Sequence, residues 1–248
     1  MRKTSFIAIV GRPNVGKSTL LNAMLGEKVA IVSSKPQTTR NRIMAVVNHD
    51  GGQYVFVDTP GFHKPRNRLG DFMMELVEET VNDTDAVLLV VEPKAAGTPE
   101  EILIENIKAS GLPCILIINK IDTLPKEELL AVIAEYQEKM DFHTVIPVSG
   151  KKKDGLDVLM QELTALLQDG GALFPEDMTS DQPERQMMAE ILREKLLLSL
   201  DKEIPHGTAV EITRFAERDD EVVEVEATIY CEKSSHKGII IGKNGAML

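Results

Sequence analysis

The chain has 248 residues, of which 43% are hydrophobic and 27% are charged, which predicts one large globular domain or two of ordinary size. The formal net charge of −11 argues against a broad nucleic-acid-binding surface and leaves short basic patches for phosphate contacts. The two cysteines have no metal-binding or disulfide spacing, which predicts a reducing, cytoplasmic environment. The apolar runs are too short for a signal-peptide core or a membrane span.

The first two-thirds of the chain alternates between strand-like and helix-like patterns. Short, nearly all-apolar runs are typical of strands buried on both faces of a parallel sheet, and they cover 6–10, 54–57, 86–91, 114–118 and 144–148. Helical patterns cover 17–25, 67–82, 99–109, 126–139 and 155–167. The segments 42–48 and 53–58 flank "HDGG" and predict a hairpin, so an antiparallel edge strand is expected. The fold class is α/β, with a doubly wound, mostly parallel sheet.

The pattern changes near residue 170. A segment rich in Gly, Pro, Asp and Ser predicts a linker over 171–183, between a first domain over 1–170 and a second over 184–248. The second domain is predicted to be α+β, with a helix over 184–200 and strands over 208–215 and 221–232 around "AERDD".

The stretch "GRPNVGKS" at 11–18 follows the first strand, opens the first helix and matches the P-loop pattern. Its glycines let backbone N–H groups wrap phosphates, and the helix N-terminus adds positive potential. Lys17 is expected to reach the β- and γ-phosphates, and Ser18 to offer its hydroxyl to magnesium. The alternative, an ordinary glycine turn, is disfavoured by the strand–turn–helix context. The predicted phosphate-binding residues are Gly11, Asn14, Val15, Gly16, Lys17, Ser18 and Thr19, joined by Gly61 from a later loop.

The stretch "NKID" at 119–122 lies at the strand end where such sheets bind ligands. Asp122 can accept hydrogen bonds from the N1–H and exocyclic amine of guanine, whereas adenine would leave it unpaired. Asn119 is expected to brace the loop and Lys120 to lie along the base. A weaker motif, "PVSGKK", brings the backbone of Ser149 and Gly150 to the guanine carbonyl. The alternative for "NKID" is a strand end without a function.

Two further loops are predicted to sense the γ-phosphate. In "DTPG", Asp58 is expected to hold magnesium through water, and Gly61 to offer its N–H to the γ-phosphate. One threonine of 33–42 is expected to close over magnesium; Thr39 is favoured over Thr38, and a solvated loop is the alternative. The predicted magnesium ligands are Ser18, Thr39 and Asp58, and the predicted switch residues are Thr38, Thr39, Asp58, Thr59, Pro60, Gly61 and Phe62.

These four motifs resemble the GTPase domains related to translation factors. Phe62 stands where many GTPases place a glutamine that orients the attacking water, and His63 is interpreted as a loop residue rather than a base. Hydrolysis is therefore expected to be slow, or to be assisted by another group. In GTPases with "PN" in the P-loop and an apolar residue after "DTPG", the asparagine helps hold a potassium ion, so the resemblance implies this role for Asn14. The alternative for Asn14 is a local hydrogen bond that fixes the turn.

The stretch "GKNG" at 242–245 matches the G-x-x-G loop with which KH domains clamp the backbone of four nucleotides. The α-β-β order before it is that of the KH variant of bacterial ribosome-associated proteins; the alternative is a helix-ending turn. The expected RNA contacts are Lys237, Gly242, Lys243, Asn244 and Gly245, and the expected packing residues before the turn are Ile239, Ile240 and Ile241.

Together, the GTPase motifs, Phe62, the linker and this ending resemble the Era family of bacterial GTPases over essentially the whole chain. The resemblance implies GTP and GDP as ligands, magnesium and potassium as ions, and small-subunit ribosomal RNA and the small ribosomal subunit as assembly partners. It also implies a cytoplasmic protein that associates peripherally with the inner membrane, and we expect a monomer. The family's KH domain continues past the turn, so we expect the RNA-binding domain to be incomplete at the C-terminus.

Three other functions account for part of the pattern. One is a tRNA-modification or ribosome-associated GTPase of the same branch without a true KH domain. Another is a P-loop kinase of small molecules, which "NKID" and "DTPG" disfavour. The third is an RNA-binding protein with an inert nucleotide site.

Overall fold

A computed structural model describes residues 3–62, 68–201, 204–218 and 222–247; for 68–70 it describes the backbone alone. The interpretation of His63 concerns a residue outside these ranges. The chain divides into two compact units, one formed by Met1–Ala30 and Thr39–Asp181, the other by Ile31–Thr38 and Gln182–Leu248. Each unit is described by itself below.

The first unit is built on a mostly parallel sheet with the strand order β2-β3-β1-β4-β5-β6. Its strands are β1 (Lys3–Val10), β2 (Ile43–His49), β3 (Gly52–Asp58), β4 (Ala86–Val91), β5 (Cys114–Ile118) and β6 (Thr144–Pro147). The pair β2–β3 is antiparallel and β2 lies at the sheet edge, so the predicted sheet and its antiparallel edge strand are confirmed. The long apolar strands explain this arrangement, because both faces of the sheet are covered by helices.

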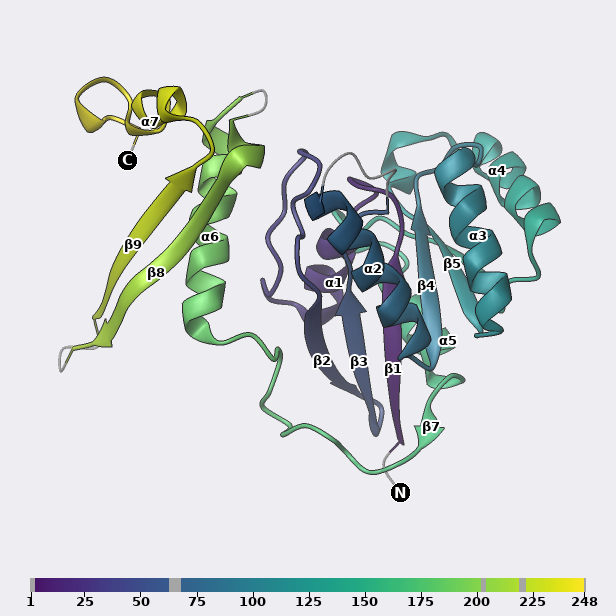
Figure 1. The fold of residues 1–248 in the computed structure, drawn as a ribbon. Helices are drawn as coiled ribbons and strands as arrows, with labels where there is room; N and C mark the ends of the chain where they lie inside the picture. Colours follow the sequence, from purple (N-terminus) through teal and green to yellow (C-terminus); the bar gives the residue numbers. More distant parts are fainter. Residues whose placement is uncertain (1–2, 63–67, 202–203, 219–221, 248) are drawn as a thin grey trace. The chain divides into compact units, whose positions relative to one another are not determined.

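Five helices cover the sheet: α1 (Lys17–Leu25), α2 (Arg68–Asn82), α3 (Thr98–Ser110), α4 (Lys126–Lys139) and α5 (Leu156–Thr164). Figure 1 shows α2 and α3 in front of the sheet and α1 behind it. The sequence predicted that the last of these helices runs to residue 167, but α5 ends at Thr164. Ser5 supplies the reason, because its hydroxyl donates to Leu166 O at 2.7 Å and accepts from Gln168 N at 3.0 Å. Residues 168–169 then form β7 (Gln168–Asp169), which pairs with β1.

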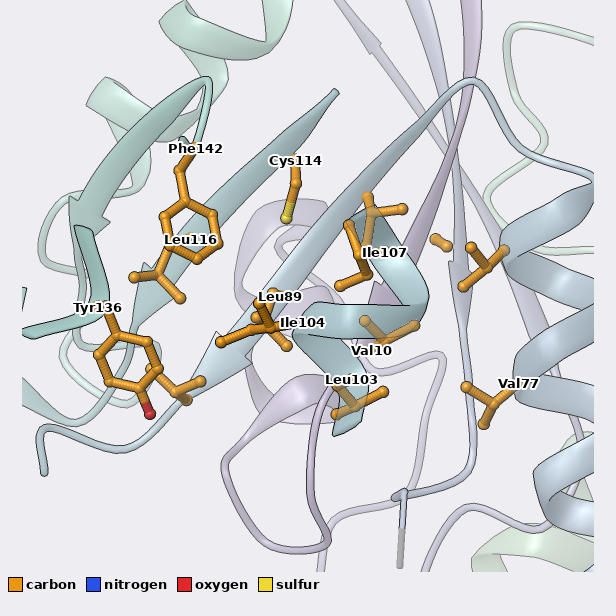
Figure 2. Packing of buried hydrophobic residues seen from close by; sticks show 14 of the residues in the cluster. Val10, Val77, Leu89, Leu103, Ile104, Ile107, Cys114, Leu116, Tyr136 and Phe142 are labelled. Atoms are coloured by element: carbon orange, nitrogen blue, oxygen red, sulfur yellow. The ribbon is translucent and has the colours of Figure 1, made fainter. Parts of the chain in front are cut away.

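The main hydrophobic core lies between the sheet and α2, α3 and α4 (Figure 2). Alternate residues of β1, β4 and β5 point into it, as the period of two of a strand requires: Ala8, Val10, Val87, Leu89, Val91, Cys114, Leu116 and Ile118. Each fully buried aliphatic side chain of this kind stabilises the fold by about 1.5–3 kcal/mol. Burial raises the pKa of the Cys114 thiol to about 12, so this cysteine packs as a neutral side chain.

Residues 171–181, which we call the strap, are hydrogen-bonded along the outer side of the β2–β3 hairpin. Gln53 accepts from the backbone N–H groups of Leu173 and Phe174 at 2.8 and 3.0 Å. Val46 N donates to Thr179 O at 3.0 Å. The side chain of Asp181 accepts from Met44 N at 3.1 Å. The strap therefore occupies backbone groups of an edge strand that would otherwise be open to another chain.

The second unit contains α6 (Glu184–Ser199), the antiparallel strands β8 (Thr208–Glu217) and β9 (Val223–Cys231), and α7 (Ser234–Ile241). Two short 3₁₀ helices, η2 (Pro205–Gly207) and η3 (Lys243–Gly245), complete it. The predicted α-β-β order followed by a helix is confirmed. Ile240 is 5% exposed, as expected of a packing residue, but Ile239 is 51% exposed, so the packing prediction is wrong for that residue.

The segment Ile31–Thr38 belongs to the second unit, where it contacts α6. The buried carboxylate of Glu194 accepts from Val32 N at 2.9 Å. The buried guanidinium of Arg193 donates to Thr38 O and forms an ion pair with Glu190 at 2.5 Å. Half of the predicted switch loop is therefore anchored to the first helix of the second unit, a contact that its polar sequence did not indicate.

Candidate nucleotide-binding site

The predicted phosphate loop lies between β1 and α1. Gly16 has a left-handed φ of 99° at the start of α1, where a Cβ atom would stand 2.3 Å from Asn119 Nδ2, so glycine is required there. Lys17 is buried, and its ammonium donates to Gly11 O at 3.0 Å and to Arg12 O at 3.1 Å. Burial lowers the pKa of Lys17 to about 8, and the nearby Asp58 opposes this shift. An anion bound at this loop would favour the charged lysine.

A buried carboxylate and two hydroxyl groups meet beside Lys17. Ser18 Oγ donates to Asp58 Oδ2 at 2.7 Å and lies 3.0 Å from Thr39 Oγ1. Burial raises the pKa of Asp58, while Lys17 and hydrogen bonds from the two hydroxyls oppose the change. Asp58 Oδ1 is buried without a hydrogen-bond partner in the described part of the chain. Such hard oxygen donors fit magnesium, which in phosphate sites is held by few protein ligands together with phosphate oxygens and water.

The other predicted switch hydroxyls bond to backbone. Thr38 Oγ1 donates to Lys35 O at 2.6 Å, and Thr59 Oγ1 donates to Ile9 O at 2.8 Å. Thr59 and Pro60 are buried. Thr39 is therefore the switch threonine whose hydroxyl contacts Ser18.

The "DTPG" loop lies directly against the phosphate loop. A Cβ atom on Gly61 would stand 2.6 Å from the backbone of Pro13, so this close approach requires glycine. Phe62 N donates to Gly11 O at 3.0 Å, and the Phe62 side chain packs against the main core. Phe62 thus contributes backbone and packing contacts, whereas a side chain that could orient water is missing at this position.

The guanine motif is tied to the phosphate loop through Asn119, which is 2% exposed. Its Nδ2 donates to Val15 O at 2.8 Å, and its Oδ1 accepts from Gly150 N at 3.0 Å. Ser149 Oγ donates to Asp122 Oδ1 at 2.7 Å, and this hydrogen bond lowers the pKa of the exposed Asp122 carboxyl. The structure therefore brings the two predicted guanine-binding loops together, with an ionised acceptor at their rim.

A charged cluster joins the same loops, and the sequence motifs did not reveal it. Lys120 Nζ donates to Asn14 O at 2.6 Å and to Glu92 Oε1 at 2.7 Å. Glu92 also pairs with Arg12 at 3.5 Å, and the buried Glu100 accepts from Arg12 Nε. The position of Glu92, directly after a buried strand, was the available signal, because ligand sites lie at that sheet edge.

The "GKNG" turn of the second unit exposes its middle residues. Lys243 and Asn244 lie on η3 with exposed side chains, and Asn244 has a left-handed φ of 56°. Lys237 is exposed on α7, and Gly245 is also exposed. A Cβ atom on Gly242 would stand 2.5 Å from Met247 Cγ. Met247 therefore covers the backbone at Gly242, whereas a Cβ atom on Gly245 would meet nothing within 4 Å. The turn thus presents ammonium and amide donors beside a backbone that is open to close approach at Gly245, a feature that a G-x-x-G clamp requires.

The described helices include none that is both long and apolar enough to cross a membrane.

The fold and the two sites define a P-loop GTPase with a KH domain, and two family profiles match accordingly: "50S ribosome-binding GTPase" over residues 6–120 and "KH domain" over 203–248. The chain is 48% identical to the GTPase Era of Ruminiclostridium cellulolyticum over 247 residues, which cover 99% of this chain and 83% of that protein. It is 49% identical to the GTPase Era of Clostridioides difficile, with coverage of 100% and 84%. The chain belongs to the Era family of GTPases.

Solved structures agree with this family assignment. A crystal structure of Era in complex with MgGDPNP and nucleotides 1506–1542 of 16S ribosomal RNA matches with a TM-score of 0.95 at 37% identity, covering 100% of this chain and 85% of that one. A variant of Aquifex aeolicus Era bound to GDP·AlF4− matches with a TM-score of 0.94 at 37% identity, covering 99% and 84%.

Proposed function

We propose that this chain binds and hydrolyses GTP with magnesium in its first unit, and binds small-subunit ribosomal RNA through its second unit during assembly of the small ribosomal subunit. The observation that carries the proposal is the buried Ser18–Asp58–Thr39 cluster beside Lys17, because it joins the phosphate loop to both switch loops. The related Era structure that holds MgGDPNP and a 16S ribosomal RNA fragment supports both halves of the proposal.

The residues take the following roles. Backbone N–H groups of the phosphate loop and Lys17 hold the phosphates, and Asp122 with Asn119 selects guanine. Ser18 and Thr39 hold magnesium directly and Asp58 holds it through water. Magnesium supplies charge neutralisation at the β- and γ-phosphates. Gly61 donates its N–H to the γ-phosphate, so loss of that phosphate on hydrolysis frees the second switch loop.

We also propose a potassium site beside Asn14. Asn14 has an exposed side chain and a left-handed φ of 65°, and its carbonyl oxygen is fixed by Lys120. Since Phe62 cannot orient water, we propose that Asn14 would help to hold a potassium ion, which would supply positive charge where negative charge develops in the transition state.

The RNA half of the proposal rests on the second unit. Lys237, Lys243 and Asn244 contact the RNA backbone, and Gly242 and Gly245 permit its close approach. We propose the division into a GTPase domain over 1–170, a connecting segment over 171–183 and an RNA-binding domain over 184–248. We further propose a cytoplasmic monomer that associates peripherally with the inner face of the cell membrane, as the family resemblance implies.

The test is GTP turnover by the chain with and without small ribosomal subunits, in potassium and in sodium buffer. We expect faster turnover in potassium, and binding of an RNA that carries the 3′ end of 16S ribosomal RNA. Lys17→Ala should abolish turnover and leave RNA binding intact, whereas Lys243→Ala should do the reverse. ATP turnover equal to that of GTP would contradict the guanine assignment, and equal rates in both salts would contradict the potassium assignment.

A further inference from the structure

Three loops at the carboxyl ends of β1, β4 and β5 are joined by one side chain. Glu92 is the first residue after β4 and accepts from Lys120 on one carboxylate oxygen at 2.7 Å. Its other oxygen pairs with Lys94 at 2.6 Å and with Arg12 at 3.5 Å. Glu92 therefore links the guanine loop, through Lys120, to the phosphate loop, through Arg12.

Lys120 combines these side-chain contacts with an unusual backbone conformation. Its backbone φ is 65°, in the left-handed region that costs a residue other than glycine about 1 kcal/mol or more. Its ammonium lies between the Glu92 carboxylate and Asn14 O, at 2.7 and 2.6 Å. With the head of the side chain fixed at both contacts, the aliphatic stem has few remaining rotamers.

Glu92 and Glu100, the two acidic residues of the cluster, have different partners. Arg12 has a second carboxylate partner in the buried Glu100, which also accepts from Gly97 N at 3.1 Å at the start of α3. Loss of Glu92 therefore leaves Arg12 paired, whereas Lys120 loses the carboxylate that orients it. Burial favours protonation of Glu92, but hydrogen bonds from Lys120 and Lys94 outweigh it and lower the pKa of Glu92 to about 2. The carboxylate is charged throughout the physiological range.

We propose that Glu92 is a positioning residue for guanine nucleotide binding, which acts by holding Lys120 in the place where its stem meets the face of the base. This inference rests on the proposed function of the site. Glu92 touches neither base nor phosphate in this arrangement; it reduces the rotamer freedom that Lys120 would otherwise lose on binding.

Replacing Glu92 should weaken nucleotide binding and leave the rate of the chemical step nearly unchanged. We expect Glu92→Ala to raise the Kd of GTP and of GDP equally, by about tenfold, which is about 1.4 kcal/mol. The kcat at saturating GTP should stay within about twofold, because the lost contact is the same in the ground state and the transition state. Glu92→Gln, which keeps an acceptor oxygen, should lie between wild type and Glu92→Ala.

A double-mutant cycle with Lys120→Met decides whether Glu92 acts through Lys120. If it does, Glu92→Ala adds less than about twofold to the Kd of the Lys120→Met variant. If the fold-changes in Kd of the two single substitutions instead multiply in the double mutant, the inference is overturned. An unchanged Kd of GTP in Glu92→Ala would also overturn the inference. So would a loss of affinity for inorganic triphosphate in Glu92→Ala that equals its loss for GTP, since inorganic triphosphate has no base for Lys120 to contact. Glu101→Gln, which removes the charge from a surface ion pair with Lys139, is the control and should bind GTP normally.

The same variants distinguish a loss of folding from a loss of nucleotide binding. Thermal unfolding of each variant shows whether it is folded at the assay temperature, and the shape-conserving Glu92→Gln gives the comparison if Glu92→Ala unfolds. A wild-type chain that fails to bind GTP would refute the proposed function itself. A wild-type chain that binds GTP while Glu92→Ala binds equally well would refute the positioning role alone.

Discussion

Replacing Asn119 by alanine should destabilise the first unit even without nucleotide. The side chain is 2% exposed and serves two buried backbone groups, Val15 O at 2.8 Å and Gly150 N at 3.0 Å. Alanine would leave both groups unpaired, and an orphaned buried donor or acceptor costs about 1–3 kcal/mol. Two such groups give a loss of about 3 kcal/mol, a large share of the ~5–15 kcal/mol typical of a folded protein.

Urea unfolding of the nucleotide-free chain measures this loss. We expect a lower midpoint with an unchanged m-value, since the surface exposed on unfolding stays the same. Asn106→Ala is the matched control, because Asn106 is exposed on α3, and its free energy of unfolding should change by less than about 0.5 kcal/mol. If Asn119→Ala loses nucleotide affinity while its stability equals that of the control, Asn119 is a base contact alone and the bracing role is wrong.

Three further perturbations test other parts of the first unit. Burial lowers the pKa of Lys17 from its ordinary 10.5 to about 8, so the folded chain binds fewer protons than the unfolded one between these values. The free energy of unfolding of the nucleotide-free wild type should therefore rise between pH 8 and 10.5 relative to that of Lys17→Met, by on the order of 3 kcal/mol. If the two proteins show parallel dependence of this free energy on pH, Lys17 is not buried as described. Leu116→Ala opens a cavity in the main core and should cost about 2–5 kcal/mol in urea unfolding; a cost below 1 kcal/mol would show that the site is not packed as described. Gly61→Ala places a Cβ atom 2.6 Å from the backbone of Pro13 and should lower GTP turnover by at least about tenfold, with normal turnover refuting this close approach.

The fold could be predicted from the sequence where a local pattern reports it. The strands β4 and β5 are short, all-apolar runs, and the structure has them at the predicted bounds, because burial on both faces leaves no other composition. The end of α5 could not be predicted, since it is decided by the hydroxyl of Ser5, more than 150 residues away in the chain. Hydrogen bonds of such sequence separation leave no periodicity to detect.

The site divides in the same way. Ser18 and Asp58 come from motifs whose spacing is fixed by the turn that each forms, and the structure brings them within hydrogen-bond distance. Glu92 belongs to no such motif, because its partners come from separate loops that meet at the sheet edge. The anchoring of residues 31–38 could not be predicted either, since a polar loop sequence does not indicate which buried charged side chain it will contact.

The strap makes residues with a linker-like composition part of a folded sheet edge. Gln53 accepts from two of its backbone N–H groups, while Thr179 O and the Asp181 carboxylate accept from N–H groups of β2. A protease that cleaves within 171–181 would release these bonds and expose Met44 N and Val46 N at the sheet edge. Such a cut should make the first unit prone to pair with a second copy of itself, although it removes no residue of the nucleotide-binding site.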